Sequence, residues 1–280
     1  MNKNTIEENR TFRLYSLVNN LLKMKIQVSY LSHFGKVRKN NEDSLLVQDE
    51  LISEANMEEP ITKVLESDKL LLAVADGMGG HTKGEVASRK VLEILKDNSG
   101  KLDQKKQVQK TFNDARMVLN DIVKEDKKSL GLGTTVSGMF ISPEKATIFS
   151  CGDSRVYRLN GNHLEKLTID HSLVQGLYES GIIAEEEMRT HPQKNIITSS
   201  ISGDMTNNKP LLSYREIIPQ KGNVFLICTD GLWESMTALE LYDCVTKEGI
   251  SEKISSLKNK SLRNYGRDNI SIIYVEILEI

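Results

Sequence analysis

Hydrophobic and polar positions follow two periods along the chain. Residues 24–30 alternate apolar and polar side chains, which predicts a strand, and the uninterrupted apolar run at 70–75 predicts a buried strand. In segments 84–96 and 104–123 the apolar residues recur at intervals of three and four, as they do on one face of a helix. The pattern therefore predicts two successive amphipathic helices that face a core, in a domain that begins near Met24.

Short apolar runs separated by turn residues fill most of the remaining chain. Ser142-Pro143 and Asn160-Gly161 are turn signals, and the second is typical of a β-hairpin. The polar stretch 49–68 is predicted to be an insertion loop with partial helix. Further strands are predicted at 44–48, 134–141, 146–151, 155–159, 209–228 and 269–276, and helical character at 172–191 and 238–258. Closely spaced strands favour antiparallel pairing, so we predict an α+β sandwich in one domain.

Residues 1–23 are predicted to be an extension outside this domain. Two alternatives stay open for them: translation that starts at Met24, or a short amphipathic helix that packs on the domain. The first ten residues are polar and carry both charge signs, so they lack the basic start and apolar stretch of a secretory signal. The longest apolar run is much shorter than the roughly 20 residues that cross a bilayer. We therefore expect a cytoplasmic location without membrane contact.

Composition narrows the function classes. The 280 residues include 37 Lys and Arg against 39 Asp and Glu, a formal net charge of −2, which argues against a nucleic-acid binder that relies on a basic field. With 39% hydrophobic and 27% charged residues, the chain is typical of a globular protein. Its three cysteines form no CxxC pair, so neither a disulfide framework nor a thiolate zinc site is indicated. We expect Cys151 and Cys228 to be buried packing residues.

Several aspartates stand where apolar strands end. Asp76, Asp153 and Asp230 each follow such a run and neighbour a glycine, and Asp268 precedes the last predicted strand. A single Asp-Gly pair is ordinary turn chemistry, but several carboxylates gathered at one sheet end are costly without cations. Oxygen ligands without cysteine or clustered histidine select magnesium or manganese, and two such ions can activate water and hold a phosphoryl group. The residues alone thus suggest metal-assisted hydrolysis, provided that these aspartates meet in space.

A second charged group lies early in the chain, between two predicted strands. Arg38 stands four residues before Glu42 and Asp43. An arginine can bind phosphate with two parallel hydrogen bonds, while the carboxylates hold metal-bound waters. The alternative is a solvated charged turn.

These segments together carry a resemblance to a known family. The motifs occur as Gly35, Arg38, 41–43, 76–81, 84–88, 133–135, 152–157, 167–168, 170–174, 191–192, Asn195, 229–232 and 268–269. In this order, from about residue 24 to 280, they resemble the metal-dependent serine/threonine protein phosphatases of the PP2C (PPM) family in their bacterial form. The resemblance implies a four-layer αββα sandwich, with two antiparallel sheets flanked by helix pairs.

The resemblance also implies a binuclear manganese or magnesium site at one end of the sandwich. Asp76 would bridge both ions, and the carbonyl oxygen of Gly77 would bind one of them. Asp230 and Asp268 would complete the other ion's shell. The domain would span 24–280.

Other motif residues take further roles by the same resemblance. Glu42 and Asp43 would act mainly through metal-bound water, and Arg38 would bind the phosphate. Asp153 would help Asp230 to hold a weaker third ion. Segment 172–192 looks like the family's flap, a mobile element beside the site that influences substrate choice.

The implied activity is hydrolysis of phosphoserine and phosphothreonine in proteins by a water or hydroxide that bridges the two ions, without a phosphoenzyme. Expected partners are phosphorylated proteins, together with a serine/threonine kinase that shares these targets, and we expect a monomer that binds neither nucleic acid nor membrane. Two alternatives stay open: a catalytically inactive scaffold of this family, against which the intact Asp76, Asp230 and Asp268 argue, and a hydrolase of small phosphoesters.

The sequence departs from the family pattern at several points. Met78 replaces a histidine that animal members carry and that is proposed as general acid, so the proton donor is unassigned, with His81 a weaker candidate. Residues 198–203 differ from the usual bacterial pattern but include no expected metal ligand. We predict that His33 is a solvated turn residue and that His171 has a structural role.

Overall fold

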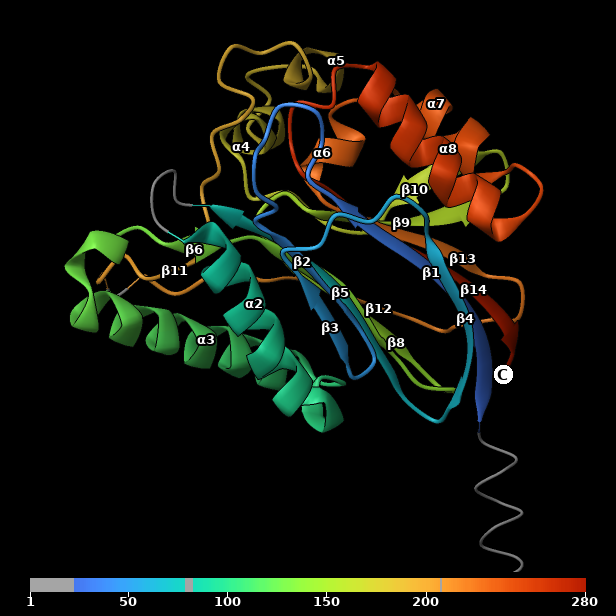
Figure 1. Cartoon of the computed structure of the whole chain (residues 1–280), viewed down its shortest axis with the longest axis horizontal. Coiled ribbons are helices and arrows are strands. Elements are labelled where there is room, and N and C mark those ends of the chain that lie inside the picture. The colour runs from blue at the N-terminus through green and yellow to red at the C-terminus, as the bar shows by residue number, and fades with distance from the viewer. Residues whose placement is uncertain (1–22, 79–82, 207) are drawn as a thin grey trace, which may run out of the picture.

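Alternating apolar residues give each of two sheets an inner face, and the computed structural model stacks these faces (Figure 1). The structure describes residues 23–78, 83–206 and 208–280. The first sheet has six antiparallel strands in the order β10-β9-β13-β14-β1-β4. Its strands are β1 (Met24–His33), β4 (Ile61–Ser67), β9 (Arg155–Asn160), β10 (His163–Lys166), β13 (Val224–Cys228) and β14 (Ile270–Glu279).

The second sheet has eight strands. Their order is β11-β6-β5-β7-β8-β12, and β2 pairs with both β5 and β3. Its strands are β2 (Asp43–Val47), β3 (Glu50–Ser53), β5 (Leu70–Met78), β6 (Gly133–Thr134), β7 (Val136–Ile141), β8 (Ala146–Cys151), β11 (Ile201–Ser202) and β12 (Ser213–Ile217). All pairings that involve these strands are antiparallel, as the short spacing predicts.

A continuous apolar core lies between the two sheets. Leu72 and Ile148 of the second sheet pack in one cluster with Val28, Phe225 and Ile273 of the first, each at most 1% exposed. Removing apolar surface from water is worth roughly 25 cal/mol per Å². This burial holds the sheets together and thereby aligns the strand ends that carry the aspartates.

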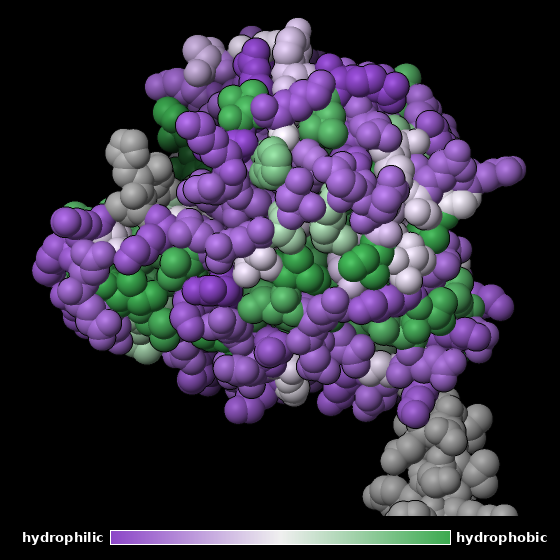
Figure 2. All heavy atoms as spheres, viewed as in Figure 1, coloured by the Kyte–Doolittle hydropathy of each residue, from purple (hydrophilic) through white to green (hydrophobic). Residues whose placement is uncertain are grey.

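Two helix pairs cover the outer faces and confirm the four-layer sandwich (Figure 1). On the second sheet lie α2 (Gly84–Asp97) and α3 (Lys105–Glu125), and on the first lie α7 (Ala238–Val245) and α8 (Ile250–Arg263). Shorter helices are α4 (Leu173–Glu179), α5 (Glu185–Met188) and α6 (Asp230–Trp233), with 3-10 turns at Ser99–Lys101 and Lys127–Ser129. Figure 2 shows hydrophilic residues over most of one face of the molecule, with smaller apolar patches between them. In the described part of the chain, no helix has the length and apolar character needed to span a membrane.

One prediction of local structure was wrong, and two were correct in type but joined separate elements. Segment 49–68 is not a loop with partial helix, because β3 pairs with β2 and β4 adds an edge strand to β1. Segment 209–228 divides into β12 and β13, which belong to different sheets. The helical character predicted at 238–258 is confirmed, but the segment holds two helices: α7 ends at Val245, and Gly249, with a φ of 75°, directly precedes α8.

The predicted solvent exposure of His33 was also wrong. It is the last residue of β1 and only 7% exposed, and its Nδ1 accepts a hydrogen bond of 2.9 Å from the backbone N–H of Gly35. Cys151 and Cys228 are buried, as predicted. His81 and residues 1–22 of the predicted extension lie outside the described residues.

Candidate active site

The two stacked sheets bring the predicted acidic residues to one end of the sandwich. Asp76 lies near the end of β5 and faces Asp43 directly in the register of β2 and β5. Asp230 opens α6, which begins just after β13 ends, and Asp268 precedes β14, the partner of β13. Residues that are far apart in the sequence therefore meet because adjacent antiparallel strands start and end at the same edge.

Asp43 is fully buried and is held by a residue that directly follows β13 of the other sheet. The hydroxyl of Thr229 donates to its Oδ2 at 2.8 Å and itself accepts from the backbone N–H of Ser271 at 3.0 Å. The Oδ1 of Asp43 has no hydrogen-bond partner among the described residues. Burial, and then the nearby charges of Asp230 and Asp268, raise the pKa of Asp43 to about 8.

Three further carboxylates share this environment. Desolvation raises the pKa of Asp230 to about 6 and that of Asp76 well above its usual value, and neighbouring carboxylates add to both shifts. The pKa of Asp153 is also raised well above normal, first by burial and then by the charge of Asp230. The Oδ1 atoms of Asp153 and Asp230 are buried and lack a hydrogen-bond partner within the described ranges. The cluster is therefore rich in negative charge and poor in donors.

The backbone around Asp76 is tightly packed. Its carbonyl oxygen accepts from the hydroxyl of Thr134 at 2.8 Å and from the N–H of Thr135 at 2.9 Å. At Gly77 a Cβ atom would collide with the carbonyls of Gly84 and Glu42. Only glycine fits there, so the strand end is rigid where the predicted ligands lie.

Asn269 fastens the loop that carries the early charged residues. Its Oδ1 accepts from the N–H of Glu42 at 2.8 Å, and its Nδ2 donates to the carbonyls of Phe34 and Asn40 at 3.1 and 2.9 Å. Burial raises the pKa of Glu42. Asn269 belongs to the motif 268–269, but its role is not visible in the sequence, because these contacts span more than 200 residues.

Asn41 anchors the same loop from its other side. Its Nδ2 donates to the hydroxyl of Ser32 at 2.8 Å and to the carbonyl of Ala55 at 2.6 Å, while its Oδ1 accepts from the N–H of Asp43 at 3.1 Å. The predicted insertion 49–68 therefore supports the candidate site through Ala55. Nothing in its polar composition indicates this role.

Arg38 and Asp268 meet in an ion pair. The Nη2 of Arg38 donates to the Oδ2 of Asp268 at 2.7 Å, with the two side chains 48% and 34% exposed. This pair turns one predicted ligand toward the predicted phosphate-binding residue. In the described part of the chain, no three acidic, histidine or cysteine side chains converge as ligands of a single ion.

The chemistry of the donor set nevertheless fits divalent cations. Every candidate ligand is an oxygen, and buried carboxylate oxygens of Asp43, Asp153 and Asp230 have no donor to compensate them. Hard ions such as magnesium and manganese prefer such ligands, and their charge would offset the repulsion that raises these pKa values.

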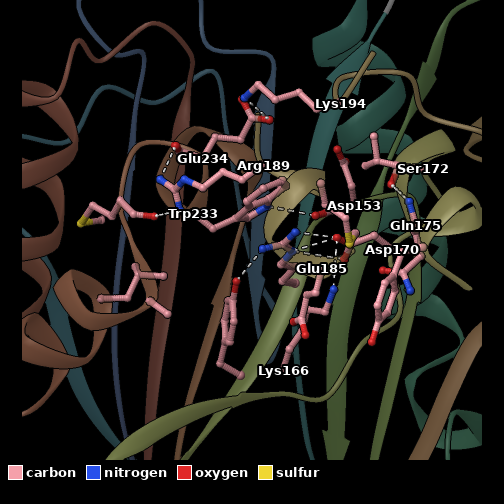
Figure 3. Close-up of a pocket in the computed structure, with 18 of the residues that line it drawn as sticks. Asp153, Lys166, Asp170, Ser172, Gln175, Glu185, Arg189, Lys194, Trp233 and Glu234 are labelled. Carbon is pink, nitrogen blue, oxygen red and sulfur yellow. Dashed lines mark hydrogen bonds and ion pairs between the residues drawn. The ribbon is translucent and has the colours of Figure 1, made fainter. Parts of the chain in front are cut away.

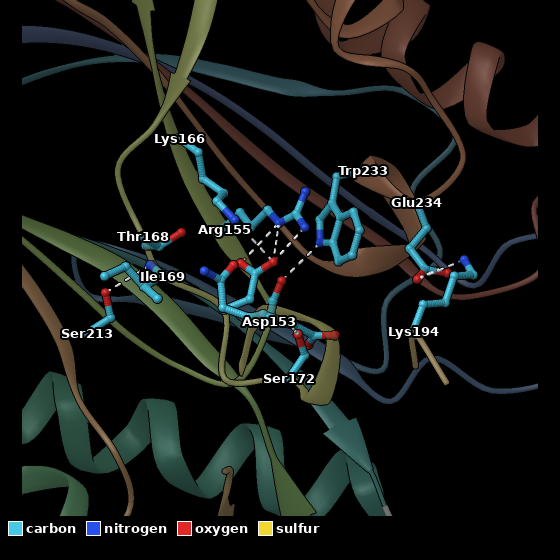
Figure 4. Close-up of polar contacts among 12 residues, drawn as sticks. Asp153, Arg155, Lys166, Thr168, Ile169, Ser172, Lys194, Ser213, Trp233 and Glu234 are labelled. Atoms are coloured by element: carbon cyan, nitrogen blue, oxygen red, sulfur yellow. Dashed lines mark hydrogen bonds and ion pairs between the residues drawn. The ribbon is translucent and has the colours of Figure 1, made fainter. Parts of the chain in front are cut away.

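A polar network around Arg155 and Trp233 contacts the backbone of Asp153 (Figure 4). The indole N–H of Trp233 donates to the carbonyl of Asp153 at 3.0 Å, and the guanidinium of Arg155 lies 3.3 Å from the centre of the Trp233 ring. Arg155 also pairs with Asp170 at 2.6 Å. The Nδ1 of His171 accepts from the N–H of Gly152 at 3.1 Å, which supports its predicted structural role. Arg155 belongs to the motif 152–157, but the sequence assigned a role neither to it nor to Trp233.

The chain is similar to known protein phosphatases. A family model described as protein phosphatase 2C matches residues 43–255. The chain is 30% identical over 250 residues to a serine/threonine phosphatase, stp, of Listeria welshimeri (86% of this chain, 92% of the relative). It is 29% identical over 260 residues to the protein phosphatase PhpP of Streptococcus pneumoniae (91% and 98%).

A third relative is longer than this chain. The chain is 28% identical over 248 residues to the serine/threonine protein phosphatase PstP of Mycobacterium tuberculosis. The aligned region covers 88% of this chain but only 44% of that relative. The crystal structure of the Mycobacterium tuberculosis phosphatase PstP/Ppp superposes with a TM-score of 0.75 at 28% identity, over 92% of this chain and all of that one. A catalytic-domain structure of PstP in complex with two manganese ions has a TM-score of 0.72 at 26% identity, over 91% and 100%.

Proposed function

The chain belongs to the protein phosphatase 2C family, and from that premise we propose that it hydrolyses phosphoserine and phosphothreonine in proteins with the help of divalent cations. The observation that carries the proposal is the cluster of carboxylates with uncompensated oxygens, beside Arg38, at one end of the sandwich. A phosphate dianion would be repelled by this cluster alone. Cations bound to the carboxylates would remove that repulsion.

We propose the following ligands for two ions, manganese or magnesium. Asp76 and the carbonyl of Gly77 would hold one ion, and Asp76 together with Asp230 and Asp268 the other. Glu42 and Asp43 would act through water, and Asp153 with Asp230 would hold a weaker third ion. The manganese-bound PstP structure supports the choice of metal. When bound, such ions supply Lewis acidity that polarises the phosphoryl group and acidifies water.

The chain's own groups bind and orient the substrate. One Nη2 donor of Arg38 is taken by Asp268, and a guanidinium has five N–H donors, so several remain for phosphate oxygens. Asn269 and Asn41 fix the loop on which Arg38 stands, and Thr229 fixes Asp43. The Met78 side chain has no proton to give, so it does not donate to the leaving oxygen.

We also propose the setting in which the activity operates. Phosphoproteins are the substrate class, as the names of the relatives support, and a serine/threonine kinase would phosphorylate the same targets. The phosphatase domain would be 24–280, acting as a cytoplasmic monomer. Size-exclusion chromatography with light scattering tests the monomer, and a chain that starts at Met24 tests the domain boundary.

The activity is tested with p-nitrophenyl phosphate and phosphopeptides. We expect turnover with manganese, no turnover with EDTA, and a preference for a phosphothreonine over a phosphotyrosine peptide. Asp230→Ala should abolish turnover with the fold intact, while Asp121→Ala, on the exposed face of α3, should not change it. Equal activity in EDTA, or normal turnover by Asp230→Ala, would refute the metal mechanism.

A further inference from the structure

A cavity of about 420 Å³ lies beside the candidate metal cluster (Figure 3). One wall is the flap segment, residues 172–192 with α4 and α5, and the opposite wall is formed by α6 and α7. Its floor is the ion pair of Arg155 and Asp170 on β9 and the loop after β10. Pockets that bind small ligands span roughly 300–1,000 Å³, so this space suffices for a large side chain.

The cavity borders the candidate active site. Asp153, proposed above as a ligand of the third ion, lines it together with Ser172 at the start of the flap segment. Trp233 also lines it and donates its indole N–H to the carbonyl of Asp153. Extended peptide residues are about 3.3 Å apart, so a peptide whose phosphoresidue is at the metals brings residues a few positions away to the cavity mouth.

Five of the eight charged side chains in the lining pair with one another. The cavity is lined by as many acidic as basic side chains. Asp170 pairs with both Arg155 and Lys166, at 2.6 and 3.3 Å, and Lys194 pairs with Glu234 at 3.2 Å. Of the other three, Arg189 donates to the carbonyls of Met236 and Glu234, Glu185 is exposed to solvent, and Asp153 is proposed above to hold an ion. A charged side chain that entered would therefore lose its water for few strong partners.

The remaining lining is largely apolar. Tyr178 of α4 and Met188 of α5 form the flap side, and Met236 and Leu241 form the opposite side. Met236 and Leu241 are at most 3% exposed, so they are fixed by the core, whereas Tyr178 is 40% exposed. Such walls favour an uncharged, apolar guest over water.

We propose that this cavity is a specificity subsite that receives a large apolar side chain, aromatic or aliphatic, of the phosphoprotein substrate, a few residues from its phosphoresidue. The inference rests on the proposed phosphatase activity, and it adds the chemistry of the sequence around the phosphoresidue. The resemblance implies only that the flap segment influences substrate choice. The cavity identifies Met188 and Tyr178 as the residues that would set that choice.

The first test compares phosphothreonine peptides that carry Phe, Ala, Glu or Lys at each position within four residues of the phosphothreonine. For the manganese-loaded full chain we expect one position at which Phe raises kcat/KM about tenfold or more over Ala, with Glu and Lys no better than Ala. No preference for Phe at any position, or a preference for Glu or Lys, would overturn the proposal.

Variants locate the preference. Met188→Lys, and Tyr178→Lys as a second variant on the other flap helix, should reduce the Phe-to-Ala ratio of kcat/KM to about one. Ile182→Lys is the matched control, because Ile182 lies in the same segment and is 68% exposed but does not line the cavity. Its ratio should equal that of the wild type. An unchanged ratio in both cavity variants would place the preference elsewhere and refute the assignment.

A binding measurement separates this inference from the proposed activity. Trp233 is the single tryptophan of the chain, so its fluorescence reports directly on the cavity. Dephosphorylated Phe peptide added to the manganese-loaded protein should change the emission, and the Ala peptide at equal concentration should not. If p-nitrophenyl phosphate is not hydrolysed, the phosphatase proposal fails, yet this titration still decides the subsite. An equal change in emission with both peptides, whether from specific or unspecific binding, would overturn the subsite proposal.

Discussion

The ion pair of Arg155 and Asp170 offers a sharp test of the network behind the candidate site. Asp170 accepts from the Nη2 of Arg155 at 2.6 Å and from its Nε at 3.1 and 3.2 Å, and Lys166 lies 3.3 Å away. The side chains of Arg155 and Asp170 are only 17% and 3% exposed. Asp170→Ala therefore leaves Arg155 and Lys166 facing each other without the carboxylate that lies between them.

The magnitude follows from the geometry. Removing one partner of a buried ion pair costs about 3–5 kcal/mol, because the remaining charge is desolvated without compensation. Arg155 also donates to the Tyr157 hydroxyl at 2.9 Å and stacks on the Trp233 ring, and these contacts hold it beside the vacated position. We expect Asp170→Ala to lower the free energy of unfolding by at least about 3 kcal/mol. Adding Arg155→Met should recover part of the loss, since no unpaired guanidinium then remains.

Urea unfolding of the manganese-loaded protein, followed by circular dichroism, measures these values. The matched control is Asp114→Ala, which breaks an exposed ion pair with Lys110 (side chains 33% exposed for Asp114 and 66% for Lys110). It should lower the free energy of unfolding by less than about 1 kcal/mol. If Asp170→Ala lost no more stability than Asp114→Ala, the pair would not be a desolvated one. The proposed coupling would be contradicted if adding Arg155→Met lowered the stability of Asp170→Ala further, by as much as an independent mutation would.

Three further predictions concern the site itself. Manganese at about 100 times its Kd should raise the free energy of unfolding by about 2.7 kcal/mol, which is seen as a higher Tm than in EDTA. An unchanged Tm would mean that the carboxylates bind no ion. Arg38→Met should raise KM for a phosphopeptide at least about tenfold. Arg38→Lys should restore only part of the lost affinity, because an ammonium cannot form the two parallel hydrogen bonds of a guanidinium. Equal KM values for the wild type and both variants would exclude Arg38 from phosphate binding. Thr229→Val removes the hydrogen-bond donor to Asp43 and should lower the free energy of unfolding, measured in urea, by about 1–3 kcal/mol. Thr246→Val, at an exposed threonine, should lower it by less. Equal losses would show that the hydrogen bond to Asp43 contributes no more to stability than an exposed one.

Local patterns predicted most of the secondary structure. The helices expected at 84–96 and 104–123 are α2 and α3, and the Asn160-Gly161 signal is the turn between β9 and β10, with Gly161 at a φ of 60°. Edge strand β4 was missed because both of its faces are largely polar or exposed, so the two-residue period that marks a strand is weak there.

Motif spacing predicted the family but not the supporting contacts. The family and its sandwich fold are confirmed by the family model and by the structural neighbours. The roles of Asn269 and Thr229 were invisible, because an amide or hydroxyl in a loop can serve many partners. Which partner it meets depends on how two sheets stack.

The sequence by itself determined the strands and helices whose periodicity is strong, and it placed Asp76 and Asp230 at strand ends. Only the tertiary structure decided that Thr229 reaches Asp43 across 186 positions and that Arg38 meets Asp268 across 230. It also decided that the flap segment encloses a cavity against α6 and α7. The physical reason is that periodicity records which face of an element is buried, while a site depends on the distances between elements, which the packing of the whole core sets.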